Sequence, residues 1–196
     1  MKLQFKHQGF QRDAARAVVE VFRGQPLQDA FAYRMDVGKG VLAMETQGFR
    51  NHDIVLDDKA LTQNIREVQI SQDLQPIDRV LRDASGTLAL SIEMETGTGK
   101  TYTYIKTMYE LYKHYGWTKF IIVVPSVAIR EGVIKSLETM ADHFAEEYGE
   151  RMQHFVYDSA HLTAIDQFAS DSKIHVMVIN TQAFNATGAD ARRITM

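Results

Sequence analysis

The run METGTGKT, from Met94 to Thr101, places two glycines directly before a lysine and a threonine. Gly97 and Gly99 have no Cβ, so the backbone between them can turn tightly, adopt positive φ and point several N–H groups at one anion. A helix that begins at such a loop adds unpaired N–H groups and the positive end of its dipole. The spacing therefore predicts a loop that wraps around the phosphates of a nucleotide.

The residue types in this loop have separate tasks in that chemistry. Lys100 would reach the β- and γ-phosphates and the Thr101 hydroxyl would bind Mg²⁺, so we predict both as catalytic residues and Thr101 as the metal ligand. Met94 replaces the first glycine of the usual G-x-x-x-x-G-K-[ST] pattern. The alternative is an ordinary glycine-rich turn with a surface lysine. We predict that ATP contacts Met94, Glu95, Thr96, Gly97, Thr98, Gly99, Lys100 and Thr101.

The segments on either side of this loop suit a strand–loop–helix order. Leu88, Leu90 and Ile92 lie in an apolar run before the loop, which predicts a strand. After the loop, apolar side chains recur at helical spacing, at Ile105, Met108, Tyr109 and Tyr112. A phosphate-binding loop requires this order of elements.

Strands and helices also alternate along the rest of the chain. The continuous apolar run Phe120–Val124, ended by Pro125, is typical of a strand buried on both faces. A helix is predicted to begin near Ser126 as its N-cap, and its apolar face would hold Val133, Leu137, Met140, Ala141 and Phe144. Strands are predicted near Phe155 and over residues 174–179. The fold class predicted is α/β, with a parallel sheet, right-handed crossovers and helices on both faces.

The N-terminal part divides into a helix and a longer insertion. Residues 11–23 predict an amphipathic helix, with Gly24 and Pro26 as its stop. Residues 27–86 are interpreted as an α+β insertion, with a hairpin around residues 37–40 and a mainly helical stretch up to Asp83. The predicted boundaries are therefore 1–26 for the N-terminal helix, 27–86 for the insertion and 87–196 for the α/β part that contains the glycine loop.

Composition sets the broad class of the protein. The chain has 196 residues, 45% of them hydrophobic, enough for one sizeable core. There is no cysteine, no secretory leader pattern and no apolar run of about 18 residues, so we expect a cytoplasmic protein without a membrane partner. The net charge of −3 excludes a uniformly basic surface, so any contact with nucleic acid must be local.

An acidic residue that ATP hydrolysis needs has no convincing candidate. Phosphoryl transfer from ATP uses a strand-end Asp to hold Mg²⁺ and a carboxylate or Gln to position water. Asp158 follows a short strand, but Ser159 stands where the glutamate is needed. We expect the chain to be a truncated fragment that binds nucleotide weakly and hardly turns it over.

Three motifs in order resemble the start of a superfamily-two, DEAD-like helicase. They are METGTGKTYTYIKTMYEL, FIIVVPSVAIREGV over residues 120–133, and HVMVINTQAFN over residues 175–185. More narrowly, the chain resembles the restriction (Res) subunit of type III restriction-modification enzymes. This resemblance covers essentially the whole chain and implies a RecA-like first motor domain, with the acidic motif, the second motor domain and the endonuclease domain absent.

The resemblance also implies cofactors and partners. The full subunit would use ATP and Mg²⁺ to communicate along double-stranded DNA, and would assemble with a modification (Mod) methyltransferase subunit. S-adenosylmethionine would enter only through that partner. Site-specific cleavage of DNA would belong to the endonuclease domain.

Site residues carried over from the family lie in three segments. Gln11 resembles the upstream glutamine that reads the adenine edge of ATP, which an amide suits because it both donates and accepts hydrogen bonds. Two later segments resemble motifs that contact the tracked DNA strand, and their residues are Pro125, Ser126, Val127, Arg130, Thr181 and Gln182.

Two other functions suit the same residues. One is a different superfamily-two translocase, such as a type I restriction motor. The other is a stand-alone nucleotide-binding module without catalysis.

Overall fold

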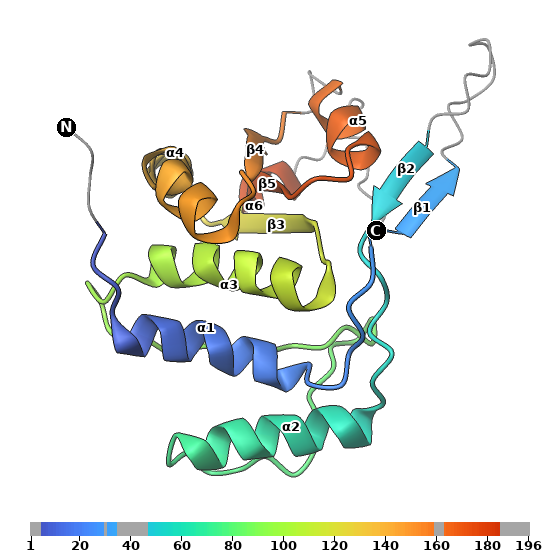
Figure 1. The fold of residues 1–196 in the computed structure, drawn as a ribbon, viewed down its shortest axis with the longest axis vertical. Coiled ribbons are helices and arrows are strands. Elements are labelled where there is room, and N and C mark those ends of the chain that lie inside the picture. The colour runs from blue at the N-terminus through green and yellow to red at the C-terminus, as the bar shows by residue number, and fades with distance from the viewer. Residues whose placement is uncertain (1–4, 30, 35–46, 159–162, 185–196) are drawn as a thin grey trace. The chain divides into compact units, whose positions relative to one another are not determined.

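The computed structural model describes residues 5–29, 31–34, 47–158 and 163–184, and the chain divides into two compact units (Figure 1). The first, called here the helical unit, comprises residues 1–27 and 53–115. The second, called the sheet unit, comprises residues 28–52 and 116–196. The stretch 27–86, which the sequence presents as one insertion, is thus shared between the two units.

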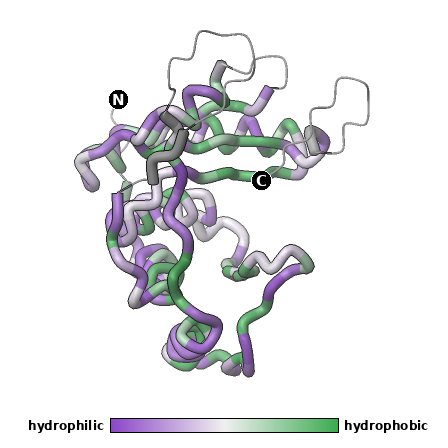
Figure 2. The backbone as a smooth tube through the Cα atoms, turned by 90° about the vertical axis from the view of Figure 1, so that its right-hand side faces the viewer, coloured by the Kyte–Doolittle hydropathy of each residue, from purple (hydrophilic) through white to green (hydrophobic). Residues whose placement is uncertain are grey.

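The helical unit contains α1 (Gly9–Val21), α2 (Asp58–Ser71) and α3 (Lys100–Tyr115). Helix α1 packs against both α2 and α3. Apolar side chains spaced three or four residues apart form its core, so polar and apolar colours alternate along the helices in Figure 2. The fully buried members of this core include Ala15, Leu61, Ile105 and Tyr109.

Helix ends in this unit are closed by polar side chains. Asp57 accepts a hydrogen bond from Ala60 N (2.7 Å) and caps α2 at its N-terminus. The buried Asn64 donates to the carbonyls of Val21 (3.0 Å) and Arg23 (2.9 Å), so α2 supplies a C-terminal cap to α1. Gly24 then has φ +101°, which confirms it as part of the predicted stop after α1.

The sheet unit is built on three parallel strands in the order β3 (Lys119–Val124), β5 (His175–Asn180), β4 (Gln153–Val156). Val176 and Val178 on the central strand are fully buried. Helices α4 (Val127–Tyr148) and α5 (Thr163–Ser170) contact this sheet, and α6 (Thr181–Phe184) follows β5. The predicted parallel sheet and the predicted helix after Ser126 are therefore confirmed.

The same unit contains an antiparallel pair, β1 (Phe31–Arg34) and β2 (Gln47–Arg50), with Phe31 opposite Arg50. This agrees with the predicted hairpin, whose turn at residues 37–40 lies outside the described residues. The Asn51 amide fixes the end of β2, because it donates to Lys119 O and accepts from the N–H groups of Thr118 and Lys119.

Two predicted elements are wrong. Residues 88–92 do not form a strand: only an isolated bridge joins Arg82 and Leu88, and no described strand pairs with this run. A strand needs a hydrogen-bonding neighbour, and apolar residues alone do not supply one. The helical stretch predicted up to Asp83 ends at Ser71, since Asp73 adopts φ +55° and Pro76 cannot donate to a continuing helix.

Candidate functional site

The glycine loop, Met94–Thr101, leads directly into α3 in the helical unit, but the strand predicted before it is not formed. The loop and the helix of the predicted strand–loop–helix order are therefore present, and the strand is not. Gly97 and Gly99 have φ of +81° and +87°, a left-handed conformation that side chains rarely adopt, so both positions require glycine. Within the loop, Thr98 N and Thr98 Oγ1 donate to Glu95 O at 3.4 and 2.6 Å. Since α3 starts at Lys100, its first unpaired N–H groups lie at the end of this loop.

The replacement of a glycine by Met94 has a structural explanation. Asp73 alone among the described non-glycine residues has positive φ, so the backbone at Met94 is one that any side chain can adopt. A Cβ built on Gly97 meets no atom within 4 Å, which means that this part of the loop borders open space. Lys100 is exposed at the start of α3, and Thr101 is partly exposed beside it.

Gln11 reaches the glycine loop from α1. Its side chain is only 9% exposed, and Nε2 donates to the carbonyl of Thr98 at 2.8 Å. The structure thus brings Gln11 together with the loop, as the prediction of one nucleotide site requires. What the sequence did not predict is that the amide is already bonded to the loop backbone.

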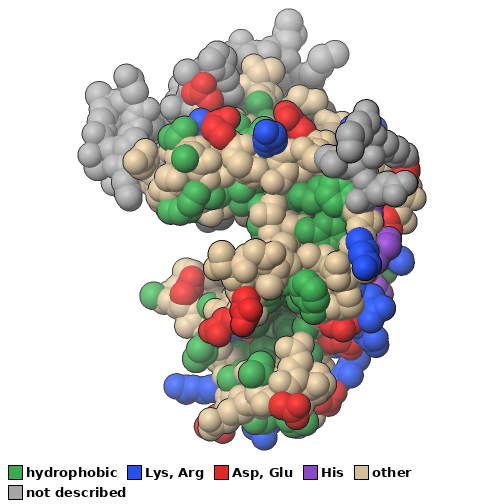
Figure 3. All heavy atoms as spheres, turned by 90° about the vertical axis from the view of Figure 1, so that its left-hand side faces the viewer, with side chains coloured by type: hydrophobic (Ala, Val, Ile, Leu, Met, Phe, Trp, Pro, Cys, Tyr) green, Lys and Arg blue, Asp and Glu red, His purple; other side chains and the backbone are tan. Residues whose placement is uncertain are grey.

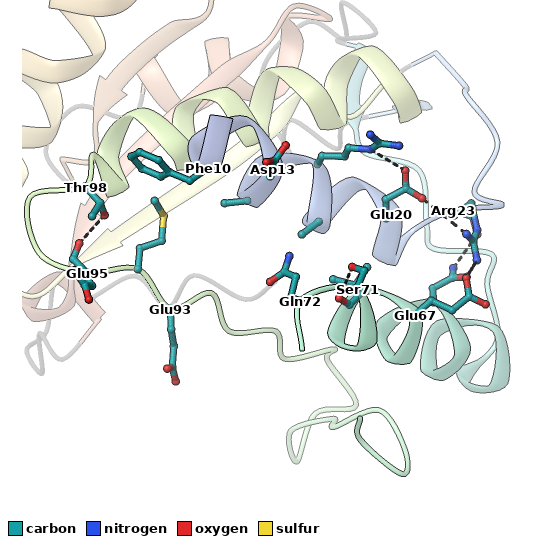
Figure 4. A pocket seen from close by; sticks show the side chains of 16 residues that line it. Phe10, Asp13, Glu20, Arg23, Glu67, Ser71, Gln72, Glu93, Glu95 and Thr98 are labelled. Atoms are coloured by element: carbon teal, nitrogen blue, oxygen red, sulfur yellow. Dashed lines mark hydrogen bonds and ion pairs between the residues drawn. The ribbon is translucent and has the colours of Figure 1, made fainter. Parts of the chain in front are cut away.

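A groove of about 860 Å³ opens beside the loop, between α1 and α2 (Figure 4). Phe10 and Thr98 lie at one end of it, and an ion pair between Arg23 and Glu67 lies at the other. The hydrogen bond from Arg23 lowers the pKa of Glu67 below its usual range. The remaining charged side chains of the lining are Asp13, Arg16, Glu20, Glu93 and Glu95.

A second group of predicted residues lies at one edge of the parallel sheet. Val124 pairs with Asn180, so Pro125 and Thr181 leave neighbouring strands at the same carboxyl edge. Predicted DNA-contacting residues from both segments are therefore brought together within the sheet unit. Thr181 and Gln182 are exposed there at the start of α6.

Helix α4 begins at this edge with an ordinary cap. Ser126 Oγ accepts from Ile129 N at 3.3 Å, which confirms Ser126 as its N-cap. Val127 is exposed, and the Arg130 guanidinium donates to Glu131 Oε1 at 2.9 Å. A DNA phosphate would therefore compete with Glu131 for Arg130.

Within the described ranges, no group of three or more His, Asp or Glu side chains is placed to hold a metal ion. The same residues contain no helix of the length and hydropathy needed to span a membrane. Thr101, the predicted protein ligand for Mg²⁺, lies at the start of α3.

The described residues form an α/β structure, with a parallel sheet in contact with helices in the sheet unit and a glycine loop that opens α3 in the helical unit. This agrees with a RecA-like helicase domain, the class to which the matching family model belongs. The family model for the type III restriction enzyme, res subunit, matches residues 57–193. The chain belongs to this family, and the resemblance inferred from its motifs is confirmed.

Three relatives share this assignment. The EcoPI Res subunit of Escherichia phage P1 is 35% identical over 150 residues, which cover 67% of this chain and 15% of the relative. The EcoP15I Res subunit of Escherichia coli is 33% identical over 153 residues, covering 69% and 16%. The StyLTI Res subunit of Salmonella typhimurium is 46% identical over 61 residues, covering 30% and 6%. The chain therefore corresponds to a small part of each relative's length.

Proposed function

We propose that this chain is the ATP-binding motor segment of a type III restriction Res subunit. The observation that carries the proposal is the glycine loop, where two left-handed glycines lead into the N-terminus of α3. Such a loop suits a triphosphate, because its N–H groups and the helix dipole all favour negative charge. Hydrolysis of ATP would supply the free energy that the full subunit uses on DNA.

The residues of the loop would divide the work of holding ATP and Mg²⁺. The exposed Lys100 side chain is free to reach the outer phosphates, and Thr101 would offer its hydroxyl to the metal ion. The backbone of residues 94–99 would surround the phosphates. The groove beside Phe10 leaves room for the nucleoside end of the molecule.

The carboxyl edge of the sheet would contact double-stranded DNA. Residues there can donate backbone N–H, hydroxyl and guanidinium hydrogen bonds to phosphates, without reading base sequence. The pairing of Val124 with Asn180 supports a single contact surface, because it places both predicted segments side by side. Its proposed members are Pro125, Ser126, Val127, Arg130, Thr181 and Gln182.

The full subunit would translocate along or communicate through DNA, cleave it with its endonuclease domain, and work in the cytoplasm with a Mod subunit that brings S-adenosylmethionine. The names of the relatives, which are subunits of restriction-modification enzymes, support the Mod partner. We propose that this chain by itself hydrolyses ATP very slowly, because Ser159 follows Asp158 where a glutamate would be needed to orient the attacking water.

The test is binding of ATP with Mg²⁺ to the 196-residue chain, measured by isothermal titration calorimetry. Lys100→Ala should weaken binding at least tenfold without changing the melting temperature, because Lys100 is exposed. Lys113→Ala, at the far end of α3, is the control and should bind like the parent. Equal affinity in parent and Lys100→Ala would overturn the site. Fast ATP hydrolysis that Lys100→Ala abolishes would overturn the expected inactivity of the segment.

A further inference from the structure

We infer that Gln11 is a positioning residue that holds the glycine loop in its phosphate-binding shape, whichever base the nucleotide carries. This inference rests on the proposed function, because it concerns the same site. It goes beyond the role that the family resemblance gives to Gln11, which is to read the adenine edge.

The first observation is where the amide nitrogen is directed. Nε2 donates to Thr98 O at 2.8 Å, across 87 residues of sequence. Thr98 lies between the two left-handed glycines, so its carbonyl orientation depends on the backbone conformation at both. A hydrogen bond at this carbonyl therefore restrains the part of the loop that would face the phosphates.

The second observation is that the loop is shaped around this amide. A Cβ built on Gly99 would lie 2.3 Å from Gln11 Nε2, closer than any real contact. The absence of a side chain at Gly99 thus allows Gln11 to reach Thr98. By contrast, a Cβ on Gly97 meets nothing within 4 Å.

The third observation is burial. Gln11 is nearly enclosed, so a shortened side chain would leave the Thr98 carbonyl without its partner. An amide carries two N–H groups and one carbonyl oxygen. With one N–H given to Thr98, the second N–H and Oε1 remain for a base, and the loop bond does not depend on that base.

A ligand with phosphates but no base separates the two roles. Inorganic tripolyphosphate with Mg²⁺ fills the proposed phosphate site and offers nothing to an adenine-reading residue. If Gln11 positions the loop, Gln11→Ala should lower the affinity for tripolyphosphate and for ATP by a similar factor, about three- to tenfold. If Gln11 only reads the base, tripolyphosphate binding will not change.

A second variant guards against general loss of structure. The carboxylate of Gln11→Glu cannot donate to Thr98 O, whereas the protonated carboxyl can. Tripolyphosphate affinity of Gln11→Glu, relative to the parent at each pH, should therefore recover as pH falls through the range where the carboxyl protonates. Damage to folding would give no such recovery. Gln8→Ala, an exposed residue one turn away, is the matched control.

Calorimetry with the 196-residue chain and both ligands decides between the outcomes. The inference is supported if Gln11→Ala loses affinity for ATP and for tripolyphosphate by a similar factor, and if the tripolyphosphate affinity of Gln11→Glu recovers at low pH. A loss for ATP alone, or an affinity of Gln11→Glu that does not recover at low pH, overturns it and leaves the proposed function intact. A parent chain that binds neither ligand, or a Lys100→Ala variant that binds both like the parent, defeats the proposed function itself.

Discussion

The two glycines of the loop adopt similar φ angles but have different surroundings, so the same substitution should have different effects. Gly97→Ala places a Cβ in open space and costs only the left-handed conformation, about 1–2 kcal/mol. Gly99→Ala has the same cost for the left-handed conformation. It also displaces the Gln11 amide, which adds about 1 kcal/mol. Urea unfolding of the two variants measures this difference.

A double-mutant cycle tests the cause of the difference. In the Gln11→Ala background the displaced amide is gone, so Gly99→Ala should cost no more than Gly97→Ala does. If Gly99→Ala keeps its extra cost there, then backbone strain at Gly99, and not the contact with Gln11, explains it.

The hydrogen bonds that amide side chains make to distant parts of the chain were the contacts least predictable from the sequence. Gln11 was predicted as a nucleotide-contacting residue from the family motif, but its hydrogen bond to Thr98 O was not predicted. Gln25 donates to Asp53 O and accepts from Val55 N. The side chains of Asn51 and Asn64 likewise donate hydrogen bonds to backbone carbonyls far away in the sequence. These partners lie between 28 and 87 residues away, so no local pattern could indicate them.

At the scale of elements, α5 and β3 are joined by a partly buried lysine. Lys119 Nζ donates to the carbonyl of Asp171, just after α5, and lies 5.3 Å from the centre of the Phe168 ring. Desolvation lowers the pKa of Lys119 to about 8, while Asp171 acts in the opposite direction. The charged form is therefore disfavoured in the folded state relative to the unfolded chain, where lysine titrates near 10.5.

This pKa shift predicts how stability depends on pH. Between pH 8 and pH 10.5 the unfolded chain holds more protons than the folded chain, so the contribution of Lys119 to the free energy of unfolding rises with pH. Lys119→Met has no titrating group at this position. Across this pH range the free energy of unfolding of the parent should rise relative to that of Lys119→Met. Urea unfolding at several pH values measures this difference. If the free energies of unfolding of parent and variant differ by the same amount at every pH, the prediction is contradicted.

The strands with continuous apolar runs were predicted at the right positions, but the predicted burial of β3 on both faces is wrong, because Ile121 and Val123 are exposed. The apolar run before the loop forms no strand. The strand over residues 174–179 is confirmed because hydrogen-bonded neighbours on both sides bury it. Leu90 and Ile92 are 42% and 50% exposed, with no neighbouring strand among the described residues. Periodicity indicates which face of a segment is apolar, but pairing depends on a partner elsewhere in the chain.

At the scale of the whole molecule, the parallel sheet has an exposed outer strand. In the described residues β3 pairs on one side only, and Ile121 and Val123 are 37% and 51% exposed. Figure 3 shows hydrophobic side chains reaching the surface on one face of the chain. An unpaired strand edge with exposed apolar side chains is a template for association with another strand.

We therefore expect the 196-residue chain to self-associate, and Val123→Lys to reduce this association by placing a charge on β3. Sedimentation velocity at several concentrations measures it, with Val127→Lys, similarly exposed but on α4, as the control. A monomeric parent, or equal effects of both substitutions, would contradict the prediction.

The same substitution should act in the opposite direction in a full-length Res subunit. If another strand pairs with β3 in that protein, Val123 would be buried there. A lysine in that position would carry a charge into the sheet and destabilise the domain by several kcal/mol. A lower melting temperature of Val123→Lys in the full-length subunit, together with reduced association of the 196-residue variant, would show that β3 pairs with another strand in the longer protein. An unchanged melting temperature would show that β3 stays an edge strand there.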